Sequence, residues 1–299
     1  MKLHHFHEVV AIAERGSIRA AARHLQIAQP ALTRSLGELE RELGAPLFER
    51  RARGVVATML GEAFVRRATL ILHEVRRARE EVDQLRGAAT GNVTVGLSIA
   101  AHLALLPTAL QPFRTRYQKI RLHIIEGFYP TLEFGLRDGA VDFYIGPDSG
   151  RKVIPELSKE VLFKGRRTIL CRAGHPLALK SSLVDLCEAD WVTTSITAEA
   201  EDEIGVIFQG IGLPPPRLAL RSQSALTLMT CLSNSDLLAM VPAQWTEFAL
   251  TRGFLTTIEV KEELAAPDIV LVRRADLPLT PAATYLLDLM LRAQGRMTK

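Results

Sequence analysis

Two clusters of polar and basic side chains near the N-terminus have a readily interpreted chemistry. Gln29, Thr33 and Arg34 are residue types that hydrogen-bond the edges of bases, and residues 50–53 form the basic run Arg-Arg-Ala-Arg. Amide and guanidinium groups pair with bases in a DNA groove, whereas arginines beside the groove contact phosphates. The two clusters therefore predict contact with double-stranded DNA, provided that secondary structure places them on one surface.

The stretch 17–43 predicts the helices that position the first cluster. Gly16 ends a first helix, Ser17 caps a second, and residues 26–28 form the turn before a third. Pro30 is expected at the first helical position, where its missing N–H costs nothing. This is a helix-turn-helix, whose second helix enters the major groove. The residues expected to face inward are Phe6, Val9, Val10, Ala13, Ile18, Ala21, Ala22, Leu25, Leu32, Leu36, Leu39 and Leu43.

A wing is predicted to follow. Two short apolar arms at 47–48 and 54–58 flank the basic run, as in a hairpin whose arginines reach phosphates. The alternatives are a helical bundle without a ligand and an ordinary solvated charge run. Ser35 is also expected on the exposed side of the third helix. The DNA-contact candidates are Ser17, Arg19, Gln29, Pro30, Ala31, Thr33, Arg34, Arg50, Arg51 and Arg53.

Residues 59–87 predict one long helix, capped by Thr58, with a heptad seam. A lone helix of this length cannot bury such a seam, so two helices are expected to pair across a two-fold axis. The alternative is that the helix packs on its own C-terminal domain. Residues 87–91 are small and predict a hinge. The seam is formed by Phe64, Ala68, Ile71, Val75, Ala78, Val82 and Leu85, of which Phe64, Ile71, Val75, Ala78 and Val82 are the dimerisation candidates.

From Asn92 onward, strand and helix patterns alternate. Helices are predicted at 103–117, broken early by Pro107, and at 131–136, with a closing helix at 281–292. A largely parallel sheet is expected, followed by a second α/β unit that begins with Leu162 to Cys171. Ile269 to Val272 is predicted to return to the first unit. The strands are predicted at 93–97, 120–126, 141–145, 162–171, 191–194, 218–220, 237–241 and 269–272.

The chain resembles the LysR-type transcriptional regulators. The resemblance rests on Phe6, the run SIRAAARHLQIAQPALTRSLGELERELGAPLFER and Thr58-x-x-Gly61, and the layout of the rest fits over the whole length. It implies a multidomain α+β and α/β protein with a periplasmic-binding-protein-like effector domain. We expect a winged helix-turn-helix at 1–58, a linker helix and hinge at 59–91, and an effector domain at 92–299. Its first lobe is expected at 92–161 and 267–299, and its second at 162–266.

Ligands of such a domain bind where strand ends meet helix starts. Helix N-termini there favour an anionic head group, while Ile99 and its alanine neighbours favour an apolar body, such as an aromatic ring. The alternative for each hydroxyl is ordinary capping and turn chemistry. The layout also loosely resembles regulators of aromatic-acid and aromatic-sulfonate breakdown. The effector candidates are Ser98, Ile99, Ala100, Thr131, Gly146, Thr194, Ser195 and Gln223.

Charge and cysteine content agree with an intracellular DNA-binding protein. Residues 1–91 hold 15 Lys/Arg against 11 Asp/Glu, whereas residues 92–299 hold 22 of each, so the whole surplus of +4 lies in the predicted DNA-binding part. Cys171, Cys187 and Cys231 are expected to be reduced and buried. We expect no signal peptide, no membrane span and a cytoplasmic location.

These patterns predict a DNA-binding regulator switched by a small organic anion, and not an enzyme, since no catalytic grouping or phosphate loop is found. His4, His5 and His7 are assigned to the surface rather than to a metal, His175 to a turn, and no cofactor is expected. The expected partners are promoter DNA, the effector, a second copy of the chain, further copies in a tetramer, and RNA polymerase. The alternatives are a ligand-independent regulator and a small-molecule-binding protein.

Overall fold

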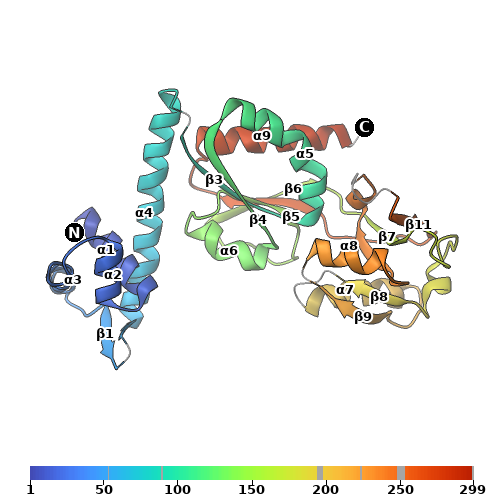
Figure 1. The fold of residues 1–299 in the computed structure, drawn as a ribbon, viewed down its shortest axis with the longest axis horizontal. Coiled ribbons are helices and arrows are strands. Elements are labelled where there is room, and N and C mark those ends of the chain that lie inside the picture. The colour runs from blue at the N-terminus through green and yellow to red at the C-terminus, as the bar shows by residue number, and fades with distance from the viewer. Residues whose placement is uncertain (53, 89, 194–197, 223, 248–252, 298–299) are drawn as a thin grey trace. The chain divides into compact units, whose positions relative to one another are not determined.

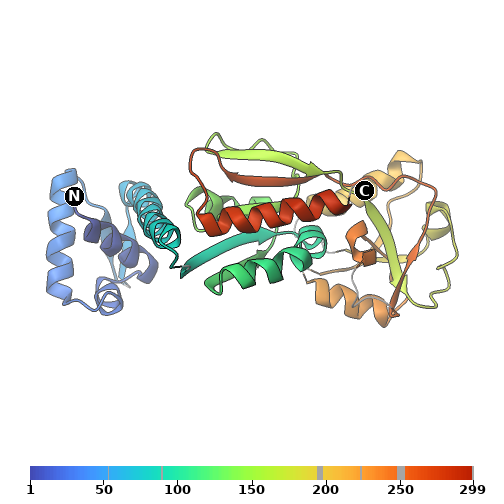
Figure 2. The same ribbon diagram turned by 90° about the horizontal axis from the view of Figure 1, so that it is seen from above.

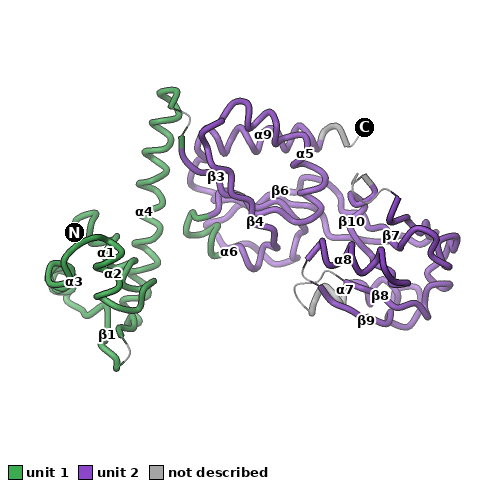
Figure 3. Tube along the Cα trace, in the orientation of Figure 1, with its two compact units in different colours: residues 1–90, 134–140 green, residues 91–133, 141–299 purple. Residues whose placement is uncertain are grey.

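A computed structural model describes residues 1–299 apart from 53, 89, 194–197, 223, 248–252 and 298–299 (Figure 1). The chain divides into two compact units (Figure 3). The first contains residues 1–90 together with 134–140, and the second contains residues 91–133 and 141–299. No helix in the described part of the chain is long and apolar enough to cross a membrane.

The predicted winged helix-turn-helix and long helix are confirmed. Ser17 accepts a hydrogen bond from the Ala20 N–H at 3.4 Å, and Thr58 accepts one from the Gly61 N–H at 2.9 Å, so both predicted caps are present. The elements are α1 (Leu3–Arg15), α2 (Ile18–His24), α3 (Gln29–Leu43), β1 (Phe48–Arg51), β2 (Gly54–Ala57) and α4 (Met59–Leu85).

Two residues predicted to face inward are exposed, and Pro30 occupies a different helical position from the one predicted. In α1 the buried stripe follows His5, Glu8, Val9 and Ile12, so Ala13 lies outside it and is exposed. Leu43, the last residue of α3, is 37% exposed, since the helix ends there at Gly44. Pro30 is the second residue of α3 rather than the first.

The wing is held against the helices by backbone contacts. The Val55 N–H donates to the Gly16 carbonyl at 2.9 Å. A Cβ on Gly54 would lie 2.2 Å from that carbonyl oxygen, and one on Gly61 would lie 1.9 Å from the Leu47 oxygen. Only glycine permits these approaches, so the sequence fixes where the wing and the start of α4 meet the helix-turn-helix.

The first lobe of the second unit is built on a five-stranded sheet in the order β4-β3-β5-β12-β6. β3 and β5 are parallel, whereas β12 runs antiparallel to both β5 and β6. The predicted return of the chain at Ile269 is thus confirmed, and α5 and α9 lie side by side on this sheet (Figure 2). The elements are β3 (Thr90–Leu97), α5 (Ile99–Arg116), β4 (Lys119–Glu126), α6 (Tyr129–Arg137), β5 (Phe143–Pro147), β6 (Leu157–Phe163), β12 (Ile269–Arg274) and α9 (Pro281–Met297).

The second lobe has two small sheets, in the orders β10-β7-β11 and β8-β9. β8 and β9 are parallel, but β7 pairs antiparallel with both its neighbours, so the expectation of a largely parallel sheet is wrong there. The elements are β7 (Arg167–Arg172), the 3-10 helix η1 (Leu183–Leu186), β8 (Asp190–Thr193), α7 (Ala198–Gly210), β9 (Arg217–Arg221), α8 (Ala225–Ser233), β10 (Ala239–Pro242), the 3-10 helix η2 (Ala243–Glu247) and β11 (Leu255–Ile258).

The chain crosses between lobes where a single strand was predicted. Within 162–171, β6 ends at Phe163 in the first sheet and β7 begins at Arg167 in another. A Cβ on Gly165 would lie 1.9 Å from the Pro267 carbonyl oxygen, so the outgoing and returning segments lie against each other. The predicted break at Pro107 is also wrong: α5 continues through it, with the exposed proline on its outer side.

Candidate functional site

The start of α3 presents the predicted base-reading residues. Gln29, Pro30, Ala31 and Arg34 are exposed, and Thr33 is half-buried. The opposite face of α3 is held in the core by three leucines, Leu32, Leu36 and Leu39. Burial of that face leaves these side chains on the outer side of the helix, as base reading requires.

Ser35 is not available to DNA in the way predicted. Its hydroxyl donates to the Glu8 carboxylate of α1 at 2.5 Å, and Glu8 is 8% exposed. A buried carboxylate needs such a donor, because burying a charge without a partner is costly. Ser35 therefore connects α1 to the recognition helix, α3, instead of facing outward.

The remaining DNA-contact candidates lie at two places. On α2, the Ser17 hydroxyl is used as the helix cap, and Arg19 is exposed. On β1, Arg50 and Arg51 are exposed, and Arg51 forms a 2.7 Å ion pair with Glu49 on the surface. Arg53 lies outside the described residues.

The seam of α4 has two parts. Near its start, Phe64 stacks on Phe6 with ring centroids 5.8 Å apart, and Ala68 is fully buried, so these residues also pack within their own chain. Further along the helix, the seam residues are more accessible to solvent. Val75 is half-buried and Ala78 is exposed, and the exposed fractions of the larger side chains are 39% for Ile71, 53% for Val82 and 72% for Leu85. The second part is an apolar stripe turned to solvent in the single chain.

The alternative partner of α4, a segment of the C-terminal domain, contacts another face. His73 and Arg77 meet residues 134–140 through the Asp138 and Gly139 carbonyls. At about 100° per residue, His73 and Arg77 lie roughly 140° around the helix from the middle of the stripe at Ile71–Leu85. This contact therefore leaves the stripe uncovered.

Ser98 and Gly146 come together at the ends of two parallel strands. Leu97 of β3 pairs with Ile145 of β5, and the Ser98 N–H donates to the Ile145 carbonyl at 2.9 Å. The Ser98 hydroxyl caps α5 by accepting from the Ala101 N–H at 3.3 Å. A Cβ on Gly146 would lie 2.9 Å from the Ser98 Cβ.

Tyr144 is a residue of this site that sequence reasoning missed. The Tyr144 hydroxyl would lie only 2.0 Å from a Gly146 Cβ, and Tyr144 is fully buried. It lies near the Tyr129 backbone N–H but has no partner within hydrogen-bond geometry among the described residues. Burial raises the pKa of Tyr144, so the hydroxyl keeps its proton and remains a donor. Side chains alternate between the two faces of a strand, so Tyr144 and Gly146 share one face of β5. This alternation is the signal in the sequence that could have placed Tyr144 beside Gly146.

The other effector candidates have more ordinary roles. Ile99 packs against a hydrophobic cluster of the second lobe that contains Val192 and Trp245, while Ala100 is buried. The Thr131 hydroxyl is exposed and donates to the Phe128 carbonyl at 2.9 Å, as expected for turn chemistry. The last three candidates lie outside the described residues: Thr194, Ser195 and Gln223.

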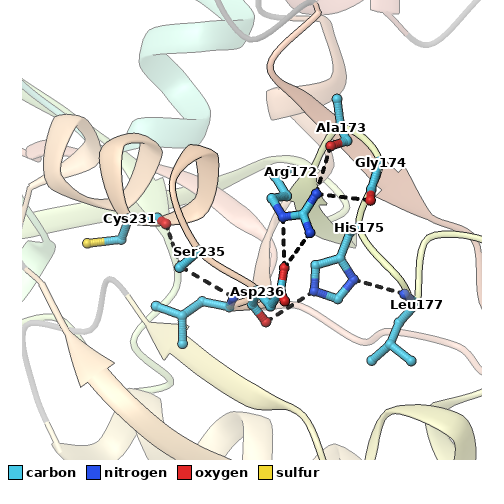
Figure 4. Close-up of polar contacts among 9 residues, drawn as sticks. Arg172, Ala173, Gly174, His175, Leu177, Cys231, Ser235 and Asp236 are labelled. Atoms are coloured by element: carbon cyan, nitrogen blue, oxygen red, sulfur yellow. Dashed lines mark hydrogen bonds and ion pairs between the residues drawn. The ribbon is translucent and has the colours of Figure 1, made fainter.

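His175 lies among turn residues, as predicted, and forms a cluster of polar contacts with its neighbours (Figure 4). His175 Nδ1 accepts from the Leu177 N–H at 3.0 Å, so Nε2 carries the proton that is shared with the Asp236 carbonyl at 3.1 Å. Arg172 joins the same turn through a 2.7 Å ion pair with Asp236. All of these bonds are internal, so the cluster supports the fold.

Three side chains differ from their predicted surroundings: His5, Cys187 and Cys231. His5 was assigned to the surface but is buried, and its Nδ1 accepts from the Lys2 N–H at 3.3 Å. Burial lowers the pKa of His5. All three cysteines are free thiols, but only Cys171 is buried, where burial raises its pKa to about 11.

A winged helix-turn-helix joined by a long helix to a two-lobed α/β domain defines the class of DNA-binding transcription regulators. Residues 3–62 match the model of the "Bacterial regulatory helix-turn-helix protein, lysR family", and residues 86–295 match that of the "LysR substrate binding domain". The chain belongs to the LysR family. It is thus a LysR-type DNA-binding transcriptional regulator with an effector-binding domain, and the members of this family are regulators, not enzymes.

Relatives and solved structures match nearly the whole chain. The HTH-type transcriptional regulator GbpR of Rhizobium radiobacter is 30% identical over 253 residues, 82% of this chain and 82% of that protein. The "SDS degradation transcriptional activation protein" of a Pseudomonas species is 28% identical over 301 residues, 99% of this chain and 96% of that protein. Full-length CbnR complexed with its target DNA has a TM-score of 0.69 and 20% identity, covering 98% of this chain and 100% of that chain.

Proposed function

We propose that this regulator reads its operator through the start of α3 and that a small organic anion controls it from the first-lobe strand ends. Gln29, Thr33 and Arg34 contact base edges, and Arg50, Arg51 and Arg53 contact phosphates beside the groove. The supporting observation is that the outer side of α3 is exposed while three leucines bury its other side. The solved complex of CbnR with its target DNA has the same fold.

The DNA-reading form is a dimer joined along α4. A helix-turn-helix reads two half-sites when two copies are related by a two-fold axis. The stripe from Ile71 to Leu85 supports this assembly, because apolar residues at heptad spacing need a second helix to bury them. Ile71, Val75, Ala78 and Val82 carry the contact, and Phe64 completes the seam where it meets the core of its own chain.

The effector is an anion with an apolar body. The observation that supports this class is the hydroxyl of buried Tyr144, which donates to no acceptor among the described residues and lies beside Ser98, at the N-terminal end of α5. A hydroxyl donor and helix N–H groups suit a carboxylate, sulfonate or sulfate, while Ile99 and Ala100 suit an apolar body. One relative is named for activating the degradation of SDS, which is itself such an anion.

The effector exerts control through different affinity for two forms of the domain. A ligand shifts the equilibrium between the two forms only as far as its affinities for them differ. A thousandfold difference in affinity corresponds to about 4 kcal/mol. Ser98, Ile99, Ala100, Thr131 and Gly146 contribute from the first lobe. The second lobe contributes Thr194, Ser195 and Gln223.

A thermal-shift screen of aromatic and aliphatic carboxylates, sulfonates and sulfates tests the effector class. A ligand that binds only the native state raises its stability by about 2.7 kcal/mol at a hundred times its dissociation constant. An anion that stabilises the wild type should stabilise a Ser98→Val variant far less. A Thr284→Val variant, altered at an exposed position of α9, should respond like the wild type. Stabilisation by uncharged analogues alone, or by no compound, would contradict the proposal.

A further inference from the structure

Helix α6 belongs to both compact units of the chain. Its first residues, from Tyr129 to Glu133, lie in the second unit, whereas residues 134–140 cluster with the DNA-binding unit and α4 (Figure 3). The segment 134–140 is therefore the part of the C-terminal half that is held by the linker helix, α4.

Two side chains of α4 bind this segment through backbone carbonyls. His73 Nδ1 lies 2.5 Å from the Asp138 carbonyl oxygen, and because a carbonyl only accepts, Nδ1 carries the proton. The Arg77 guanidinium donates to the Gly139 carbonyl at 3.1 Å. Arg77 is 7% exposed, which is unusual for an arginine and marks a built contact rather than a surface one.

The segment is shaped to present both carbonyls. The Asp138 N–H donates to the Phe134 carbonyl at 2.9 Å, and the Asp138 carboxylate accepts from the Ala140 N–H at 2.9 Å. Gly139 has a φ of +76°, and a Cβ there would already touch His73 and Arg77, at 3.6 and 3.7 Å. The positive φ would strain any other residue at 139, so the backbone conformation that presents the two carbonyls favours glycine.

The other end of α6 is packed at the proposed effector site. The Tyr129 ring lies 6.4 Å from the ring of Tyr144, centroid to centroid. Leu132 fills the space above Gly96 of β3, where a Cβ would lie 2.4 Å from the leucine side chain. This end of α6 therefore packs directly on β3 through Leu132 and on β5 through Tyr129.

We propose that α6 connects the effector site to the linker helix, and that His73 and Arg77 are the positioning residues that transmit its movement to α4. The inference rests on the proposed effector site for the origin of that movement. A nine-residue helix spans about 13 Å and moves as one body. A ligand that displaces Tyr144 therefore shifts the Asp138 and Gly139 carbonyls and, through them, the helix that carries the DNA-binding domain.

Amide hydrogen exchange of the full-length protein tests the docking contact without DNA or effector. The comparison is between Arg77→Met, which keeps the apolar stem but removes the donors, and Arg79→Met, which removes an exposed arginine of the same helix. We expect peptides covering 134–140 to exchange at least about tenfold faster in Arg77→Met. Arg77→Lys should restore much of the protection, and Arg79→Met should match the wild type.

Transmission is tested by perturbing the far end of α6. Gly146→Ala places a methyl group 2.0 Å from the Tyr144 hydroxyl and displaces it; Tyr144→Phe removes the same hydroxyl with less disturbance. We expect both to change exchange in the α4 peptides 70–80 when Arg77 is present. In combination with Arg77→Met, the change in α4 should disappear while the change at 143–147 persists.

The outcomes separate this inference from the proposed function. Unchanged protection of 134–140 in Arg77→Met, or no response of α4 to either first-lobe variant, would overturn it. So would an α4 response that is equally large with and without Arg77. None of these results depends on an anion binding, so the thermal-shift screen can succeed or fail independently of them.

Discussion

The contact between Ser35 and Glu8 should determine how firmly the recognition helix is held. Replacing Ser35 with Ala leaves the Glu8 carboxylate, 8% exposed, without the hydroxyl that donates to it at 2.5 Å. A hydrogen bond to a charged group contributes about 1.5–3 kcal/mol. We therefore expect Ser35→Ala to destabilise the DNA-binding unit by about that amount, measured by exchange of the α1 and α3 amides in the full chain.

The double-mutant cycle with Glu8→Ala makes this reasoning testable. Removing both partners leaves no buried carboxylate unsatisfied, so the double variant should be more stable than the two single losses predict, by about 0.5–3 kcal/mol. Affinity for a DNA site selected from a random library should fall with the same pattern. Single losses that simply add would show that Ser35 and Glu8 are not coupled. A loss of DNA affinity without a loss of stability would show that Ser35 acts on DNA directly.

Three further changes test other parts of the account. Ile71→Asp should dissociate the proposed dimer in sedimentation, because it would bury like charges across the proposed two-fold seam, whereas Arg76→Asp, on another face of α4, should not. Burial alone would raise the pKa of Glu262, but hydrogen bonds from the Ser182 hydroxyl and the Leu183 N–H lower it. The ionised Glu262 therefore stabilises the fold at pH values above 4.5, its ordinary pKa, and this contribution is lost as the pH falls below that value. Denaturant unfolding of Glu262→Gln should accordingly show a deficit near pH 7 that vanishes in acid; a constant deficit would argue against it. Ser98→Val should abolish the response to any stabilising anion and leave DNA affinity unchanged, which a titration with that anion checks.

Local patterns were sufficient for the DNA-binding unit. Gly16, Ser17 and Thr58 mark helix ends through interactions within a few residues, so the boundaries of the helices and the wing could be predicted from spacing. The buried stripe of α1 could not, because it contains His5 and Glu8. Hydrophobic periodicity does not reveal a buried carboxylate whose partner is 27 residues away.

The C-terminal half depended more on contacts between distant residues. The return of β12 followed from its apolar run, but the division of 162–171 into two strands depends on Gly165 meeting Pro267, about a hundred residues later. In the sequence, a tyrosine within an apolar strand predicts only core packing. The relation of Tyr144 to Ser98 appears only once β3 and β5 are paired. The contacts of His73 and Arg77 have no signature in sequence, since their acceptors are backbone carbonyls.

We expect the outer side of α3 to read a DNA sequence while the wing contacts phosphates. The most direct test of this expectation is the affinity of full-length Arg34→Ala and Arg50→Ala for a selected site and for random DNA, across a range of salt concentrations. We predict that Arg34→Ala costs about 1–3 kcal/mol on the selected site and much less on random DNA. Arg50→Ala should weaken both equally and flatten the salt dependence. Equal losses on both DNAs for Arg34→Ala would contradict the account.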